Sequence, residues 1–218
     1  MNHTSSKKFM IQIAVVTGLL LLSLVPVAAG MYRLYSLAAP TVVTPLNARF
    51  FAAPVPIAIH AAATLYLVLG AFQFVPALRR GRNNWHRRAG KATLALGYAA
   101  AISGLWMTLT YPWPPQDNAV LFAFRLMVGV MMLFALTSGT AAIIRRDFTA
   151  HRQCMMRAYA LGMGAGTQAL VLTLWAVLIG SPDPMTRALL MGACWGGNLA
   201  LAVWLTRDKR GLSQQAAY

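Results

Sequence analysis

The chain has 218 residues, of which 58% are hydrophobic and only 11% are charged. Soluble domains are about 25% charged, so this composition excludes an ordinary soluble domain and favours an integral membrane protein. The formal net charge of +15 does not indicate nucleic-acid binding. The positive residues lie in short groups between apolar runs, as membrane topology signals do.

Six apolar runs are long enough to cross a bilayer, which takes about 20 helical residues. They lie at 9–29, 57–78, 92–111, 119–144, 158–180 and 187–206. The sequence therefore predicts an all-α integral membrane protein, a bundle of six transmembrane helices. The expected organisation is a first helix or signal anchor (1–29), an outer-face loop (30–56), a five-helix core (57–206) and a cytoplasmic tail (207–218).

The first apolar run also resembles a signal peptide, because "VAA" precedes Gly30 as a cleavage site. Its apolar core is longer than that of a usual signal peptide, which favours a helix that stays in the protein. Cleavage would leave five spans and the same topology for the rest of the chain.

Positive residues divide unequally between the two sides of the predicted bundle. Fifteen lie at the N-terminus, at 79–91, at 145–157 and in the tail. Only Arg33, Arg49 and Arg187 lie in the other connections, and Arg125 lies inside a span. The positive-inside rule therefore places both termini and both basic segments in the cytoplasm of a bacterial inner-membrane protein.

Acidic residues are few and lie outside the spans. There is no glutamate, and the four aspartates, at 117, 147, 183 and 208, fall in connections or in the tail. Carriers coupled to protons or sodium usually place a carboxylate in a span, and this chain has none there. Hydrolases that use a pair of carboxylates are disfavoured for the same reason. We also expect no metal site and no disulfide, because the two cysteines, Cys154 and Cys194, have no zinc-type spacing and lie in different environments.

Two His-Arg pairs carry the clearest pattern in the chain. Arg79-Arg80 precedes His86-Arg87, and Arg145-Arg146 precedes His151-Arg152. The two histidines are 65 residues apart, and the same offset carries His60 onto Arg125. The pattern indicates a weak internal repeat that places His86 and His151 at one depth, at the cytoplasmic starts of two spans.

Positive side chains at a helix start favour an anionic ligand, because the helix dipole is also positive there. The first hypothesis is that these segments bind an anionic lipid head group or a partner subunit. The binding residues would be Arg79, Arg87, Arg88, Arg152 and Arg157. The second hypothesis is a redox protein in which His86 and His151, with His60 as a further candidate, bind b-type haem or a quinone.

His60 and Arg125 are the ionisable residues expected near the outer ends of their spans. His60 either bonds to a neighbouring carbonyl group or acts as a ligand or proton carrier. Arg125 either extends to the outer surface or faces the interior beside His60, where it would bind an anion or a quinone-like carbonyl. The third hypothesis is therefore an anion carrier that uses Arg125, for which no span supplies an acidic partner.

Other polar and small residues in the spans are expected to serve helix packing. Gln73 and Gln168 should form hydrogen bonds between helices. The pairs Gly162/Gly166 and Gly192/Gly196 have GxxxG spacing, which permits close packing within the chain. The sequence does not decide whether the protein is an enzyme or a homo-oligomer.

The motifs "GAFQF", "HRRAG" and "HRQCMMRAYAL" resemble a bacterial family of predicted membrane proteins, domain of unknown function 2306. The resemblance covers about residues 50–180. The matching positions are His60, Gln73, Arg79, His86, Arg87, Gly90, His151, Arg152, Met155, Arg157 and Ala158. The family often has tryptophan where this chain has Cys154. The resemblance implies a membrane protein with several spans and supplies no activity.

Overall fold

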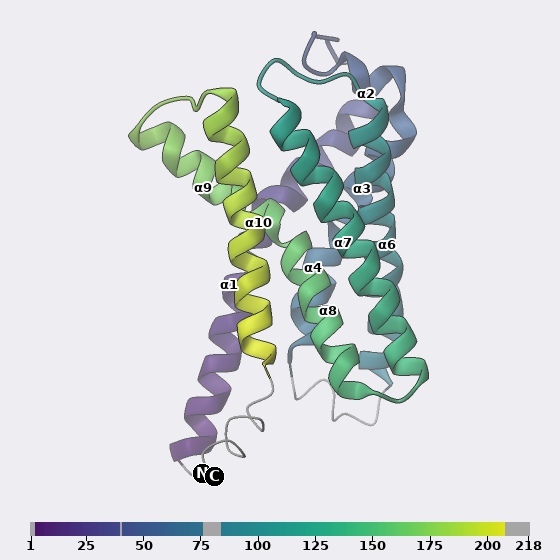
Figure 1. The fold of residues 1–218 in the computed structure, drawn as a ribbon, viewed down its shortest axis with the longest axis vertical. Helices are drawn as coiled ribbons and strands as arrows, with labels where there is room; N and C mark the ends of the chain where they lie inside the picture. The colour runs from purple at the N-terminus through teal and green to yellow at the C-terminus, as the bar shows by residue number, and fades with distance from the viewer. Residues whose placement is uncertain (1–2, 40, 76–83, 208–218) are drawn as a thin grey trace.

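Nine helices make up the part of the chain that the computed structural model describes, which is residues 3–39, 41–75 and 84–207 (Figure 1). Their bounds are α1 His3–Ala38, α2 Ala48–Ala52, α3 Pro54–Ala63, α4 Leu65–Gln73, α6 Trp85–Thr110, α7 Ala119–Ile144, α8 Phe148–Gly162, α9 Gly164–Leu178 and α10 Pro184–Thr206.

Six segments are long and apolar enough to cross a membrane, which confirms the predicted number of spans. They are α1 from Met10 onward, α3 with α4, α6, α7, α8 with α9, and α10. The helices extend further than the apolar runs: α6 begins at Trp85 and α8 at Phe148, and α1 continues to Ala38. Hydropathy detects only the apolar part of a helix, whereas backbone hydrogen bonding continues into its polar ends.

Two of the six spans are interrupted by a single residue. Thr64 separates α3 from α4, and Met163 separates α8 from α9. At both places the backbone forms bonds between residues three apart, from Leu67 to Thr64 and from Gly166 to Met163. These tighter turns leave each helix pair as one span with a local irregularity.

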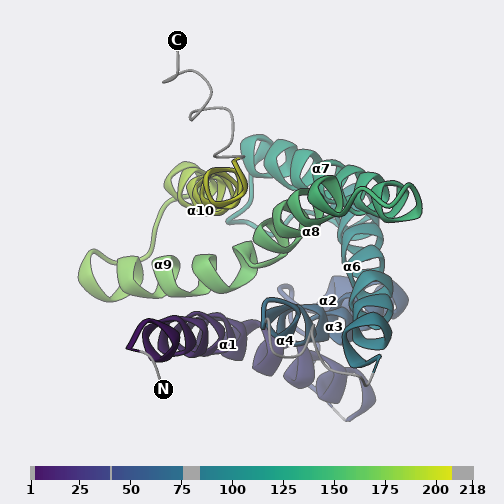
Figure 2. The ribbon, with the colours of Figure 1, turned by 90° about the horizontal axis from the view of Figure 1, so that it is seen from below.

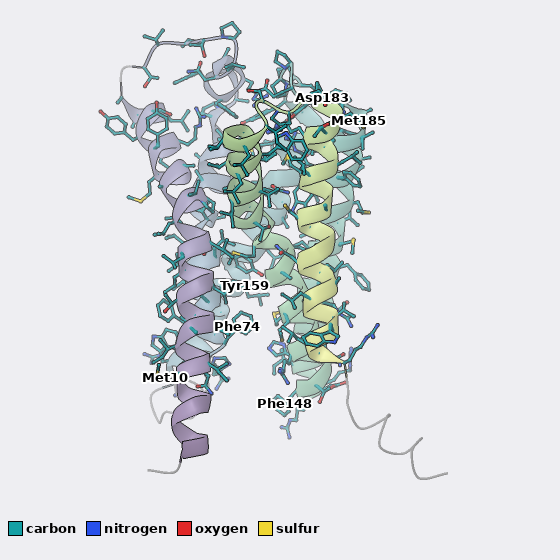
Figure 3. The ribbon with its side chains drawn as sticks, turned by 90° about the vertical axis from the view of Figure 1, so that its left-hand side faces the viewer. Met10, Phe74, Phe148, Tyr159, Asp183 and Met185 are labelled. Atoms are coloured by element: carbon teal, nitrogen blue, oxygen red, sulfur yellow. The ribbon has the colours of Figure 1, made fainter. Side chains whose placement is uncertain are left out.

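The two ends of the bundle differ in charge. Figure 1 shows that the start of α1, the end of α10 and the α7–α8 turn all lie at the same end of the bundle. We call this end the basic end. It carries the exposed side chains of Arg87, Arg88, Arg145, Arg146 and Arg152. The other end, which we call the opposite end, carries Asp183 and Met185 (Figure 3). That the basic end faces the cytoplasm stays a prediction from the distribution of charge.

Close helix packing joins α1 to the rest of the bundle. Figure 2 shows α9 running beside α1. At Gly166, an added Cβ atom would lie 2.3 Å from the backbone oxygen of Leu22. The Gly162/Gly166 pair therefore packs within the chain, as predicted. In the second pair only Gly192 is in contact, with Phe124, and Gly196 faces open space.

The core lies where α8 crosses α4. The hydroxyl group of Tyr159 donates to the backbone oxygen of Leu67 at 2.7 Å. Its ring lies 5.1 Å from that of Phe74 (Figure 3) and 5.7 Å from that of Tyr66. Tyr159 is only 6% exposed, so its hydroxyl group cannot rely on water and needs this hydrogen bond to the backbone.

Candidate functional site

A cavity of about 410 Å³ lies inside the bundle, toward the opposite end. Residues of every described helix except α1 line it, and the apolar side chains include Tyr66, Leu105, Leu161 and Trp195. Its polar lining includes Arg49, His60, Asp117, Arg125 and Gln168. An apolar cavity with a few convergent polar groups is the usual form of a small-molecule binding site.

His60 and Arg125 line this cavity together, as one of the sequence-based alternatives proposed. His60 is the seventh residue of α3 and Arg125 is the seventh residue of α7, and the two helices begin 65 residues apart, at Pro54 and Ala119. The offset found between the histidines therefore also relates the helix starts. It explains why these two residues reach a similar depth.

The ring of His60 is held against α6. Its Nδ1 atom lies 3.1 Å from the backbone oxygen of Ala100 and 3.0 Å from Oγ of Ser103. Because a carbonyl oxygen can only accept, this geometry places a proton on Nδ1 and leaves Nε2 as the other ring position for a ligand. An added Cβ atom at Gly104 would lie 3.2 Å from the ring. The expected bond from His60 to a carbonyl group is thus confirmed.

Arg125 has an acidic partner, which comes from a connection between helices and not from a span. Its Nη1 atom lies 2.5 Å from Oδ2 of Asp117, and Nη1 of Arg187 lies 3.4 Å from Oδ1 of the same residue. The Asp117 side chain is only 3% exposed. Asp117 belongs to the connection before α7, so a search for carboxylates within spans did not find it.

Arg49 is a further residue of the site that the sequence did not single out. It lies on the short helix α2, lines the cavity and donates from Nη1 to the backbone oxygen of Pro112 at 3.3 Å. The only available signal was that Arg33, Arg49 and Arg187 are the few positive residues in the connections away from the basic segments.

The His-Arg pairs lie at the starts of α6 and α8, as predicted. Arg87, Arg88 and Arg152 are exposed, and His86 and Arg157 are half-buried. The Nδ1 atom of His151 lies 2.8 Å from the backbone oxygen of Gly139 on α7. Arg79, also assigned to this site, lies outside the described residues.

Haem binding by His86 and His151 stays a prediction from the sequence. A visible spectrum of protein purified from haem-replete cells tests it. A Soret band that a His86→Ala/His151→Ala variant loses would support haem, and a colourless preparation would exclude it.

Gln73 and Gln168 were both expected to form hydrogen bonds between helices, and one of them does. Gln168 donates to the backbone oxygen of Met191 at 3.2 Å and so joins α9 to α10. The amide nitrogen of Gln73 is buried and has no hydrogen-bond partner among the described residues. Cys154 and Cys194 are both free thiols, as expected.

These features define an α-helical membrane protein with several spans and a cavity within its bundle. The chain belongs to the family of predicted membrane proteins DUF2306, whose model matches residues 57–206, from α3 to the end of α10. No curated protein and no solved structure matches the chain. The family confirms the resemblance seen in the sequence, and the activity has to be argued from the cavity.

Proposed function

We propose that this protein binds an amphipathic small molecule from the membrane in the cavity between His60 and Arg125. The observation that carries the proposal is that both residues line one cavity of about 410 Å³ whose remaining wall is largely apolar. Small-molecule sites have volumes of about 300–1,000 Å³ and use a few polar groups to orient the ligand. A polar head would lie at the arginine and histidine side chains, and an apolar chain would extend toward Tyr66.

Tryptophan fluorescence offers a direct test, because Trp113 and Trp195 line the cavity. The protein in phosphatidylcholine nanodiscs is titrated with dibromostearic acid and, separately, with dibromostearyl alcohol. Bromine quenches tryptophan on contact, so binding in the cavity should give a saturable component above the linear quenching by probe in the bilayer. At least one probe should show this component.

A cavity-filling variant shows whether the saturable component comes from the cavity. Ala165 of α9 lines the cavity and is exposed, so we expect Phe at this position to extend into the space. Ala165→Phe should remove the saturable component. Ala176→Phe is the matched control, because Ala176 is exposed on the same helix away from the cavity. Equal saturable quenching in both variants would reject the proposed function.

The second candidate function is binding of an anionic lipid, or of a partner subunit with an acidic surface, at the basic end. It is favoured by five exposed arginines at the start of α6 and around the α7–α8 turn, Arg87, Arg88, Arg145, Arg146 and Arg152. The neighbouring carboxylate of Asp147 accepts from the backbone N–H of Ala150, as the N-cap of α8. A basic surface beside helix starts attracts lipid phosphate.

Thermal unfolding in nanodiscs of different lipid tests this second function. Phosphatidylglycerol should raise the unfolding midpoint above its value in phosphatidylcholine, and high salt should reduce the difference. Replacing Arg87 and Arg88 by Gln should remove most of the gain if lipid binds there. An equal midpoint in both lipids contradicts lipid binding. If a protein co-purifies with the natural chain and is lost from the double variant, the arginines instead bind a partner subunit.

A further inference from the structure

Four arginines lie together at the opposite end, and three of them interact with one carboxylate, that of Asp117. Arg125 and Arg187 form ion pairs with its two oxygen atoms. Arg49 interacts electrostatically with Asp117, Arg125 and Arg33. The guanidinium carbons of Arg33 and Arg49 lie 4.2 Å and 4.7 Å from the ring centre of Phe50. Four guanidinium groups and one carboxylate give this cluster a formal charge of +3.

The described carboxylates leave part of this charge uncompensated. Both oxygen atoms of Asp117 are already paired, and Asp183, also at this end, caps α10 by accepting from Met185 and Thr186. Among residues 3–39, 41–75 and 84–207, no carboxylate forms an ion pair with Arg33 or Arg49.

Arg49 is a member of the cluster that lines the cavity and has a buried donor without a partner among the described residues. Its Nε atom is buried and has no hydrogen-bond partner among the described residues. Burial lowers the pKa of Arg49, attraction to Asp117 raises it, and repulsion from Arg125 and Arg33 lowers it further. Because Arg49 also lines the cavity, an anion there would gain charge-assisted hydrogen bonds from a group that otherwise lacks them.

We propose that the cavity takes an ionised acid with a single apolar chain, whose carboxylate or phosphate head lies against Arg49 and whose chain extends toward Tyr66 and Leu161. This inference rests on the proposed function and names the class of its ligand. A neutral quinone-like carbonyl would leave the cluster charge in place, whereas an acid offsets it. The cavity volume suits one chain, so a phospholipid would insert only one of its two.

The experiment compares the two bromine-labelled probes at a pH where the acid is ionised. The acid should bind at least about tenfold more tightly than the alcohol, the ratio expected from about 1.4 kcal/mol of additional interaction. Arg49→Gln should weaken binding of the acid about tenfold and leave binding of the alcohol unchanged. Arg207→Gln, an exposed arginine just after α10 that belongs to neither proposed site, should change neither. Rising salt should weaken the acid alone.

The outcomes separate this inference from the proposed function. If acid and alcohol bind equally and Ala165→Phe blocks both, the cavity binds amphipathic molecules and the preference for an acid is wrong. If Arg49→Gln leaves the acid affinity unchanged, the assignment of the head group is wrong. If neither probe binds saturably, both proposals fail.

A competition arm identifies the source of the acid. Unlabelled stearic acid that displaces the labelled probe, while phosphatidylglycerol in the nanodisc does not, indicates a free acid. Displacement by phosphatidylglycerol at a matched fraction of the lipid indicates a phospholipid head group. Displacement by neither, with the labelled acid still bound, would contradict recognition of an acidic head.

Discussion

The carboxylate of Asp117 lies 2.5 Å from the guanidinium group of Arg125, and the Asp117 side chain is only 3% exposed to solvent. The same carboxylate also pairs with Arg187 of α10. One residue of the α6–α7 connection thereby joins α7 to α10 beside the cavity. This ion-pair group both stabilises the opposite end and sets its charge.

Asp117→Asn should destabilise the protein, because it removes the shared negative charge and leaves two arginines close together. Breaking a fully buried pair costs about 3–5 kcal/mol. Since both arginines are partly exposed, we expect about 1–3 kcal/mol, seen as a lower thermal midpoint in detergent. Asp147→Asn is the control, because asparagine caps a helix as well as aspartate does. An unchanged midpoint for Asp117→Asn would show that the pairs contribute little.

Gly166→Ala should also lower the midpoint, for a steric reason. Its Cβ atom would lie 2.3 Å from the backbone oxygen of Leu22, and neither backbone can move without separating α1 from α9. Overpacking of this kind costs about 1–3 kcal/mol. Gly196→Ala provides the comparison, because its Cβ atom meets nothing within 4 Å and alanine favours the helix. The prediction fails if the two variants have the same stability.

Tyr159→Phe tests the contact between α8 and α4. The variant leaves the ring in place and removes the buried hydrogen bond to Leu67, which should cost about 0.5–1.5 kcal/mol. Tyr98→Phe is the matched change at an exposed hydroxyl group, bonded to Thr137 at 3.1 Å, and should have a smaller effect. Thermal unfolding of both variants side by side decides the question, and a larger effect at Tyr98 would contradict this assignment of the core.

The sequence predicted the spans and singled out His60 and Arg125, which line the cavity, because both inferences depend on patterns along the chain. Six apolar runs are visible in the hydropathy pattern along the chain. The 65-residue offset also relates His60 to Arg125 before any fold is known. Asp117 and Arg49 could not be found this way. Asp117 lies in the connection between α6 and α7, and Arg49 lies on the short helix α2, outside the spans. Only the folded chain turns these segments toward the bundle interior.

Helix ends and the relation between the two His-Arg pairs show a similar limit. Hydropathy places the third span at 92, yet α6 begins at Trp85, so His86 and Arg87 are helical residues. The sequence correctly placed His86 and His151 at helix starts. Binding of one haem by both histidines stays a prediction, because the spacing of the two residues along the chain does not specify the orientation of their rings.

Binding of an acid in the cavity can be seen in a crystal structure of the protein with dibromostearic acid, in which anomalous scattering locates the bromine atoms. We expect a bromine peak inside the cavity, near Tyr66 and Leu161, with the acid head against Arg49. Bromine peaks confined to the lipid-facing surface, with the cavity unchanged, would contradict it.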